Sequence, residues 1–139
     1  MVENPETGAL EPFDFNYLQD NVPELRLLGC DISSVEFSPP LDSSAITTED
    51  WVQLARVIEE HYEDYDGFVI LHGTDTMAYT ASAMSFVFEG LSKPIVFTGS
   101  QLPVGKLRTD GKENLITPIE IAAARDEAGR PRVPEVTLF

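Results

Sequence analysis

A continuous apolar run at residues 68–71 does more than any other feature to limit how this chain can fold. The run ends abruptly in the polar sequence His-Gly-Thr-Asp-Thr at residues 72–76. A strand with apolar side chains on both sides needs cover on both faces of its sheet, which is typical of parallel sheets between helices. A similar run at residues 95–98 leads into a Gly-Ser loop. We therefore expect two buried strands, near residues 67–71 and 94–98.

Segments with helical periodicity alternate with these runs. In residues 48–63 the apolar side chains fall on one face, and Thr47 stands three residues before Asp50, as in a capping box with Asp in place of Glu. Residues 77–88 carry a second apolar stripe, which Gly90 can close at its C-terminal end. These patterns predict one helix before and one after the first apolar run.

Two prolines limit the helices predicted elsewhere. The apolar spacing of residues 15–28 is helical, but Pro23 will shorten or split that helix. Another helical stripe falls at residues 115–123, where Pro118 would clash with the carbonyl group four residues earlier. That helix must therefore start near Thr117 or be kinked there.

Three further segments complete the expected organisation. Residues 34–38 alternate polar and apolar side chains before Pro39 and predict a short strand, and the β-prone residues 133–139 predict another. Residues 1–14 read as an irregular surface loop. Alternating strands and helices with short connections predict an α/β fold, a mostly parallel sheet with helices on both faces. The 139 residues have the size of one domain, and their β-prone end leads us to expect a piece of a longer protein.

The composition excludes several kinds of partner. With 24 acidic and 9 basic residues, the chain has a net charge of −15 and would repel nucleic acid. Its single cysteine, Cys30, cannot form an intrachain disulfide or a structural zinc site, which favours a reducing compartment. No run approaches the roughly 20 apolar residues of a membrane span, and the first residues lack a secretory signal. We therefore expect a cytoplasmic protein that binds neither nucleic acid nor membranes.

Metal and nucleotide sites are not predicted either. The acid-rich residues 59–66 match no calcium loop and are better explained as the solvated end of a helix. Neither a Walker sequence nor Gly-x-Gly-x-x-Gly occurs, and the local basic cluster at residues 106–108 stands in a chain dominated by acids. The expected site is therefore one without a metal.

Polar side chains gather instead in three loops. Because parallel strands end at the same edge of a sheet, the loops at residues 42–44, 72–76 and 98–101 can meet there. Hydroxyl groups and helix N-terminal amides can hold a carboxylate, and a buried Asp75 can hold an ammonium group. We therefore predict a pocket for a small zwitterion or an amide.

Each of these groups also has a purely structural explanation. Asp75 or Thr76 could equally cap the following helix. Residues 42–44 could form an ordinary turn. His72 flanks a buried strand and His61 lies among acids, positions more typical of structural residues than of catalytic bases, so we expect neither histidine to be catalytic.

The order and spacing of these motifs resembles bacterial L-asparaginase. The resemblance rests on His-Gly-Thr-Asp-Thr-Met at residues 72–77, Thr-Gly-Ser-Gln-Leu-Pro at 98–103, and Asp-Gly through Asn-Leu across 110–115. Residues 66–71 and the Asp-Ser-Ser loop at 42–44 are similar to the type I, cytoplasmic branch. The resemblance covers almost the whole chain and implies part of an asparaginase N-terminal domain, a three-layer fold similar to flavodoxin and Rossmann folds.

The resemblance also implies roles for individual residues. Thr74 would be the family's second catalytic threonine, and Asp75 would bind the α-ammonium group of the substrate. Four other residues would contact the substrate or complete its binding loop: Asp42, Ser43, Ser44 and Ser100. The implied reaction is hydrolysis of L-asparagine to L-aspartate and ammonia by threonine nucleophilic catalysis. It needs no metal or organic cofactor, and the full-length protein would be a homo-oligomer.

Parts of the family site do not occur in this sequence. The Thr-Gly-Gly-Thr-Ile segment that carries the first threonine, generally assigned as the nucleophile, is absent, and the lysine that activates Thr74 would follow Phe139. A mobile-loop tyrosine is not evident in residues 1–14, and the C-terminal domain lies outside these residues. Because such groups act as a unit, we expect activity in the full-length protein but not in the 139 residues alone.

Two alternatives to an asparaginase remain open at this point. One is the asparaginase-like subunit of a transfer-RNA-dependent amidotransferase, for which an extra N-terminal domain and a partner subunit would be expected. The other is a non-catalytic fragment that binds an amino acid or assembles with another chain, because an open sheet edge invites strand pairing.

Overall fold

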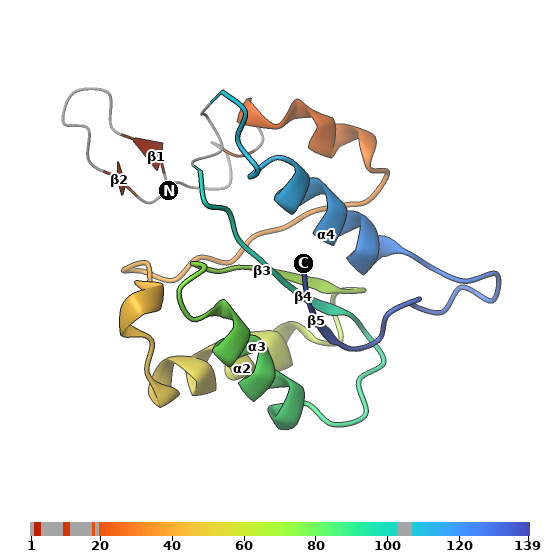
Figure 1. Ribbon diagram of the computed structural model, residues 1–139. Helices are drawn as coiled ribbons and strands as arrows, with labels where there is room; N and C mark the ends of the chain where they lie inside the picture. The colour runs from red at the N-terminus through yellow and green to blue at the C-terminus, as the bar shows by residue number, and fades with distance from the viewer. Residues whose placement is uncertain (1, 4–9, 12–17, 19, 103–106) are drawn as a thin grey trace.

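The fold is layered, with a small sheet between helices (Figure 1). The computed structural model describes residues 2–3, 10–11, 18, 20–102 and 107–139. Its layers are those of an α/β fold, which confirms the fold class predicted from the alternation of strands and helices.

The sheet has three parallel strands in the order β3 (Phe68–Leu71), β4 (Ile95–Thr98) and β5 (Val136–Leu138). Phe68 pairs with Ile95, which pairs in turn with Val136. Both apolar runs are therefore strands, but only β4 is buried along its whole length. In the described sheet β3 is an edge strand that is half-buried, with Leu71 49% exposed, so the expectation of a buried strand is wrong there. The last strand is shorter than the predicted range 133–139.

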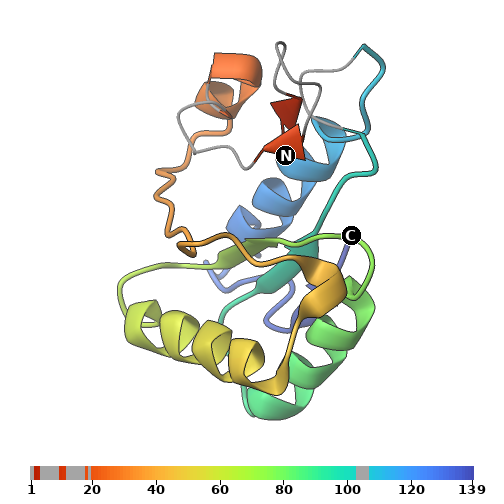
Figure 2. The same ribbon diagram turned by 90° about the vertical axis from the view of Figure 1, so that its left-hand side faces the viewer.

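Helices cover both faces of this sheet. Helices α2 (Thr48–His61) and α3 (Met77–Val87) lie on one face, and α4 (Glu113–Ala123) lies on the other (Figures 1 and 2). Among the described residues, no helix has the length and apolar character needed to cross a membrane. The two-sided cover explains why the strands are apolar on both sides.

Two hydrophobic clusters hold the layers together, one on each face of the sheet. Ile95 and Phe97 are fully buried in the cluster formed with α2 and α3. Val69 packs on the other face against Leu115 and Ile119 of α4. Neighbouring strand residues point to opposite faces, so the continuous apolar runs supply both clusters.

The predicted start of α2 matches the structure, whereas the predicted end of α3 does not. The capping box of α2 is confirmed: the Thr47 backbone N–H donates to Asp50 Oδ2 at 2.8 Å, and the Asp50 N–H donates to Thr47 Oγ1 at 3.3 Å. Helix α3 ends at Val87, and Phe88 has an extended backbone conformation. Gly90, with φ of 65°, serves the turn beyond the helix and does not close it.

Pro118 lies inside α4, which begins at Glu113, so the alternative of a helix starting near Thr117 is wrong. Proline has no amide hydrogen to donate to the carbonyl oxygen of Asn114, four residues earlier. The hydroxyl of Thr98, at the end of β4, donates to that oxygen at 2.6 Å. A side chain of the sheet thus replaces the missing helical hydrogen bond.

The strand predicted at residues 34–38 is wrong, because the structure has no regular element there. Alternation predicts an extended backbone, but a strand also needs a neighbouring strand to complete its hydrogen bonds. Phe37 packs against the cluster between the sheet and α2, whereas Val35 is 57% exposed. The alternation therefore reflects a packed side chain between exposed ones.

The helix predicted over residues 15–28 is split at Pro23, as expected. Residues 18, 20 and 21 are helical, and Pro23 then begins the 3₁₀ helix η1 (Pro23–Leu27). Leu25 of η1 is buried against α4. The first residues of the predicted helix lie outside the described part of the chain.

The N-terminal segment is not wholly irregular, which corrects the prediction for residues 1–14. Two short strands, β1 (Val2–Glu3) and β2 (Leu10–Glu11), pair antiparallel. The other residues of the predicted loop are outside the described ranges.

Candidate functional site

The candidate site lies where β3 ends and α3 begins. Thr76 is the N-cap residue of α3, but its side chain makes no capping hydrogen bond. Its hydroxyl donates instead to the backbone oxygen of Ser43 at 2.6 Å. The carboxylate of Asp75 is directed toward Ser43, whose Oγ donates to Asp75 Oδ2 in a long hydrogen bond of 3.4 Å. The sequence predicted a buried Asp75, but the residue is exposed, which corrects that expectation. Thr76 therefore holds the N-cap position of α3, but its hydroxyl connects the helix to the loop of Ser43.

Ser43 belongs to a short 3₁₀ helix, η2 (Ser43–Ala45), that Asp42 caps at its N-terminal end. Asp42 Oδ1 accepts from the backbone N–H of Ser44 at 2.9 Å and from its hydroxyl at 2.8 Å. These bonds, the backbone one first, lower the pKa of Asp42. Only 8% of Ser43 is exposed. Asp42 and Ser44 thus hold the loop, while Ser43 faces Asp75.

A glycine makes the approach of Ser43 feasible. A Cβ atom on Gly73 would lie 2.2 Å from Ser43 Oγ, a distance that real side chains do not reach. The glycine of the His-Gly-Thr-Asp-Thr motif is therefore needed for the contact between the two loops. The loop at residues 42–44 meets the end of β3 although no strand precedes it.

Thr74 has a partner that the sequence did not single out. Gln101 Nε2 donates to Thr74 Oγ1 at 3.0 Å, from the loop after β4. The loops come this close because Gly99 has no side chain: a Cβ there would lie 2.3 Å from the backbone oxygen of His72. In the sequence, the one feature that could have indicated a role for Gln101 was its position directly after Ser100, in a loop at the end of a strand.

Asp110 anchors the loop that carries Gln101. Its carboxylate accepts from the backbone N–H of Gln101 at 2.9 Å and of Leu102 at 3.1 Å. Asn114 Nδ2 donates to Asp110 at 3.2 Å and to the backbone oxygen of Gly99 at 2.8 Å. The N–H of Gln101 is the main cause that lowers the pKa of Asp110. Asp110 is therefore a charged acceptor at neutral pH.

Ser100, a predicted site residue, and His72, which was not expected to be catalytic, contribute less to this cluster of side chains. Ser100 is half-buried in the loop after β4, between Gly99 and Gln101. His72 Nδ1 lies 2.6 Å from the backbone oxygen of Gly73, and its ring lies 6.2 Å from that of Phe97. The contacts of His72 are thus with the strand region and not with Thr74 or Asp75.

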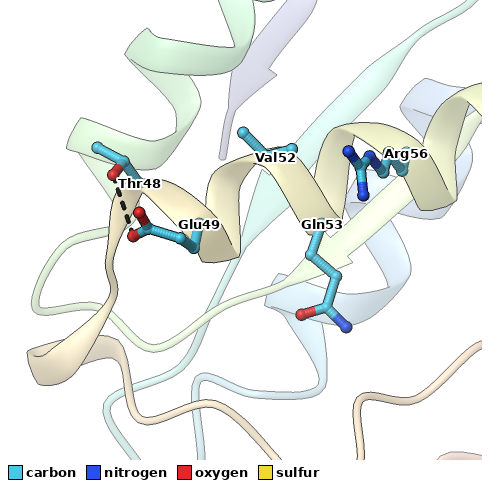
Figure 3. A pocket seen from close by; sticks show the side chains of 5 residues that line it. All are labelled: Thr48, Glu49, Val52, Gln53 and Arg56. Carbon is cyan, nitrogen blue, oxygen red and sulfur yellow. Dashed lines mark hydrogen bonds between the residues drawn. The ribbon is translucent and has the colours of Figure 1, made fainter.

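No group of three or more metal-ligating side chains comes together within the described ranges. A surface hollow does run along α2, lined by Thr48, Glu49, Val52, Gln53 and Arg56 (Figure 3). All of these side chains come from successive turns of one helix, and none is a predicted site residue. The strand-end loops, where groups from three segments converge, are the better candidate.

The geometry of these loops suits a small amino acid. An exposed carboxylate and a buried hydroxyl face each other in Asp75 and Ser43, and the hydroxyl of Thr74 belongs to the residue before Asp75. A carboxylate can bind an ammonium group, and hydroxyls can donate to a carboxylate or polarise an amide. Such an arrangement can recognise a zwitterion and hold its side-chain amide beside a hydroxyl.

Comparisons with known proteins identify a family and several relatives that are similar to this chain. Residues 1–139 match the family model for the N-terminal part of asparaginase. The chain is 53% identical over 109 residues to L-asparaginase 1 of Escherichia coli K12, covering 78% of this chain and 30% of that protein. The crystal structure of L-asparaginase I from Vibrio cholerae superimposes with a TM-score of 0.82 at 44% identity, covering 94% of this chain and 38% of that one.

A further relative belongs to an amidotransferase. This glutamyl-tRNA(Gln) amidotransferase subunit from Thermoplasma volcanium is 46% identical over 124 residues, covering 85% of this chain and 29% of that protein. The chain therefore spans about a third of the length of these three relatives. Because the family model matches every residue of it, the chain belongs to the asparaginase family and corresponds to the N-terminal region of its members.

Proposed function

We propose that the protein containing these residues hydrolyses L-asparagine to L-aspartate and ammonia. The observation that carries the proposal is the contact of Ser43 with Asp75 and Thr76, in the loop that also carries Thr74, after the end of β3. Membership of the asparaginase family supports the same activity. The reaction is proposed for the full-length protein, because the chain covers about a third of its relatives.

In this proposal Asp75 and Ser43 bind the amino-acid end of the substrate. The Asp75 carboxylate receives the α-ammonium group, and the Ser43 hydroxyl donates to the α-carboxylate. The 3.4 Å bond between them is long for two oxygen atoms, so a ligand can replace it at little cost. Asp42 and Ser44 keep Ser43 in place.

Thr74 acts at the side-chain amide. Because Gln101 donates to Thr74 Oγ1, the threonine's own proton is available to a substrate or water molecule. We assign Thr74 to assist the attack on the amide carbon or the later hydrolysis, with ammonia as the leaving group. The backbone of Ser100 lies beside the amide in this arrangement. The covalent nucleophile is assigned to a threonine outside these 139 residues, and no metal or cofactor takes part.

An amidotransferase is the second candidate, favoured by the 46% identity to the Thermoplasma volcanium protein. It would release ammonia from glutamine for a partner subunit. The choice of substrate separates the two proposals. We favour asparagine because the family resemblance of the Asp-Ser-Ser loop is to the type I asparaginase branch, which also supports a cytoplasmic homo-oligomer.

Ammonia release by the full-length protein tests both the reaction and the role of Thr74. We expect turnover of L-asparagine in preference to L-glutamine, and a fall in kcat of about a thousandfold or more in Thr74→Val, because groups of one catalytic unit are lost together. Thr48→Val is the matched control, since Thr48 is exposed on α2. Full turnover by Thr74→Val would contradict the assignment, and a preference for glutamine would favour the amidotransferase.

A further inference from the structure

The register of the sheet brings Gln101 to Thr74. Leu71, the last residue of β3, pairs with Thr98, the last residue of β4. Thr74 and Gln101 each follow three residues after that pair, where two parallel strands end at the same edge of the sheet. Gln101 Nε2 donates to Thr74 Oγ1 at 3.0 Å. The contact between these two side chains therefore depends on how the strands pair.

Both branches of the Thr74 side chain contact the loop after β4. The hydroxyl oxygen accepts from Gln101, and the methyl carbon Cγ2 lies beside Gly99, where an added Cβ atom would be 3.3 Å away from it. A threonine side chain is stiff at its single torsion angle and has few allowed rotamers. One contact on each branch therefore fixes the position of Oγ1.

The amide group of Gln101 restricts where the proton of Thr74 can point. An amide nitrogen donates and does not accept, whereas a hydroxyl group has one proton and two lone pairs. The bond from Gln101 occupies a lone pair of Oγ1, so the hydroxyl proton is directed to another acceptor. A donor on the oxygen also stabilises it as the proton is given away. Gln101 thus keeps the Thr74 proton off the loop after β4.

The backbone of Gln101 is anchored, but its side chain has one partner. Asp110 Oδ2 accepts from the backbone N–H of Gln101 at 2.9 Å. Gln101 is exposed, and within the described part of the chain its side chain makes no hydrogen bond besides that to Thr74. An exposed amide could bond to water instead, so the fold does not require this contact. The side chain of Gln101 therefore serves Thr74, and its substitution should leave the fold intact.

We propose that Gln101 is a positioning residue for the amide hydrolysis: its side-chain amide holds Thr74 Oγ1 and directs the hydroxyl proton into the site. The inference rests on the proposed function, because it takes Thr74 to act at the side-chain amide of the substrate. It adds the group that decides which way the Thr74 proton points. Since Ser43 and Asp75 bind the other end of the substrate, Gln101 affects the chemical step and not binding.

Steady-state kinetics of the full-length protein separate catalysis from binding. The substrate is L-asparagine, or L-glutamine where that amide is hydrolysed faster. Gln101→Met keeps the length of the side chain and removes the N–H donor, so kcat should fall about tenfold while KM changes by less than about twofold. Gln53→Met is the matched control, because Gln53 is exposed on α2. Near-native circular dichroism and urea midpoints show that each variant keeps its fold.

Gln101→Glu tests the direction of the hydrogen bond. An ionised carboxylate only accepts, so it draws the Thr74 proton toward the loop, and kcat should fall about a hundredfold near neutral pH. A protonated carboxyl group can donate again. The ratio of variant to wild-type kcat should therefore rise about tenfold between about pH 7 and pH 5, as the new group becomes protonated. Gln53→Glu, with the same change of charge, should show no such rise.

The titratable groups around position 101 do not obscure this ratio. Asp75 follows Thr74, Asp110 holds the loop, and the backbone oxygen of His72 adjoins Gly99. All three are present in the wild type, so their own titration cancels in the ratio. The negative charges of Asp75 and Asp110 favour protonation of the new carboxyl group, which extends the rise toward neutral pH.

A double-mutant cycle shows whether Gln101 acts through Thr74. In the Thr74→Val background no hydroxyl remains to be positioned, so Gln101→Met should leave the residual kcat unchanged. A wild type that hydrolyses neither amide would refute the proposed function and, with it, the assignment of Gln101. An active wild type would overturn the Gln101 assignment alone in three cases: a normal kcat in Gln101→Met, no acid recovery in Gln101→Glu, or an equal loss in both Thr74 backgrounds.

Discussion

At the scale of single residues, the hydroxyl of Thr74 is positioned by a chain of hydrogen bonds that begins in α4. Asn114 donates to Asp110, Asp110 holds the backbone of Gln101, and Gln101 donates to Thr74. Thr74 is therefore tied to residues from two later segments of the chain. The most testable link is the carboxylate of Asp110, because its charge depends on pH.

Asp110→Asn should remove the pH-dependent contribution that the Asp110 carboxylate makes to the free energy of unfolding. Hydrogen bonds from backbone N–H groups, chiefly that of Gln101, lower the pKa of Asp110 below its ordinary value of 3.8. A carboxylate with a lowered pKa stabilises the fold above the pKa of the unfolded chain, and this contribution is lost as the pH falls through the folded pKa. We expect Asp110→Asn to unfold at lower urea concentration than the wild type near neutral pH.

The difference between the two urea midpoints should shrink when the pH falls below 3.8. Protonated Asp110 and its amide replacement then have equal charge and similar shape. A midpoint difference that is the same at neutral and at acidic pH would show that the charge of Asp110 contributes nothing to the loop.

At the scale of elements, α4 and β4 are joined where a helical hydrogen bond is missing. Thr98 is 1% exposed, and its hydroxyl satisfies the Asn114 carbonyl that Pro118 leaves without a helical donor. This contact explains how a proline fits inside α4. It also fixes the start of α4 against the strand whose end carries the candidate site.

A double-mutant cycle measures that contact. Thr98→Val should lower the free energy of unfolding by about 1–2 kcal/mol, because the Asn114 carbonyl loses its partner. In the Pro118→Ala background the new amide at position 118 can donate to Asn114, so the same substitution should cost less. The free energies come from urea unfolding of the four proteins. Equal costs of Thr98→Val in both backgrounds would contradict this account.

Secondary structure could be predicted from the sequence where the pattern within a single segment determines it. The apolar runs of β3 and β4 indicated burial on both faces, and Thr47 with Asp50 indicated the start of α2. Residues 34–38 show the limit of such prediction. Alternating side chains are a property of one segment, whereas a strand also needs a second segment to pair with. The bond from Thr98 to Asn114 could not be predicted for the same reason.

In the candidate site, too, residues within single motifs could be predicted, whereas contacts between loops could not. Thr74, Asp75 and Ser43 were singled out from motifs, and the structure brings them to the end of β3. Gln101 and Asp110 were not assigned roles, because their contacts depend on how closely two loops approach at Gly99. That distance is a property of the folded chain and not of either loop sequence.

At the scale of the whole molecule, the candidate site and the exposed aromatic side chains of α3 lie in different places. The candidate site uses the loop before the N-terminus of α3, whereas Tyr79 and Phe86 are exposed on the helix itself. A substitution at Phe86, which is 84% exposed, is therefore expected to leave the contact between Ser43 and Asp75 intact.

Calorimetric titration of L-aspartate into the purified chain tests the central claim most directly, namely that the loops around Asp75 recognise a small amino acid. The account predicts a heat of binding that Asp75→Asn abolishes because the ammonium group loses its carboxylate. Asp66→Asn, at an acidic side chain that is 96% exposed, should bind like the wild type. No binding by the folded wild-type chain, or binding that Asp75→Asn leaves unchanged, would contradict the account.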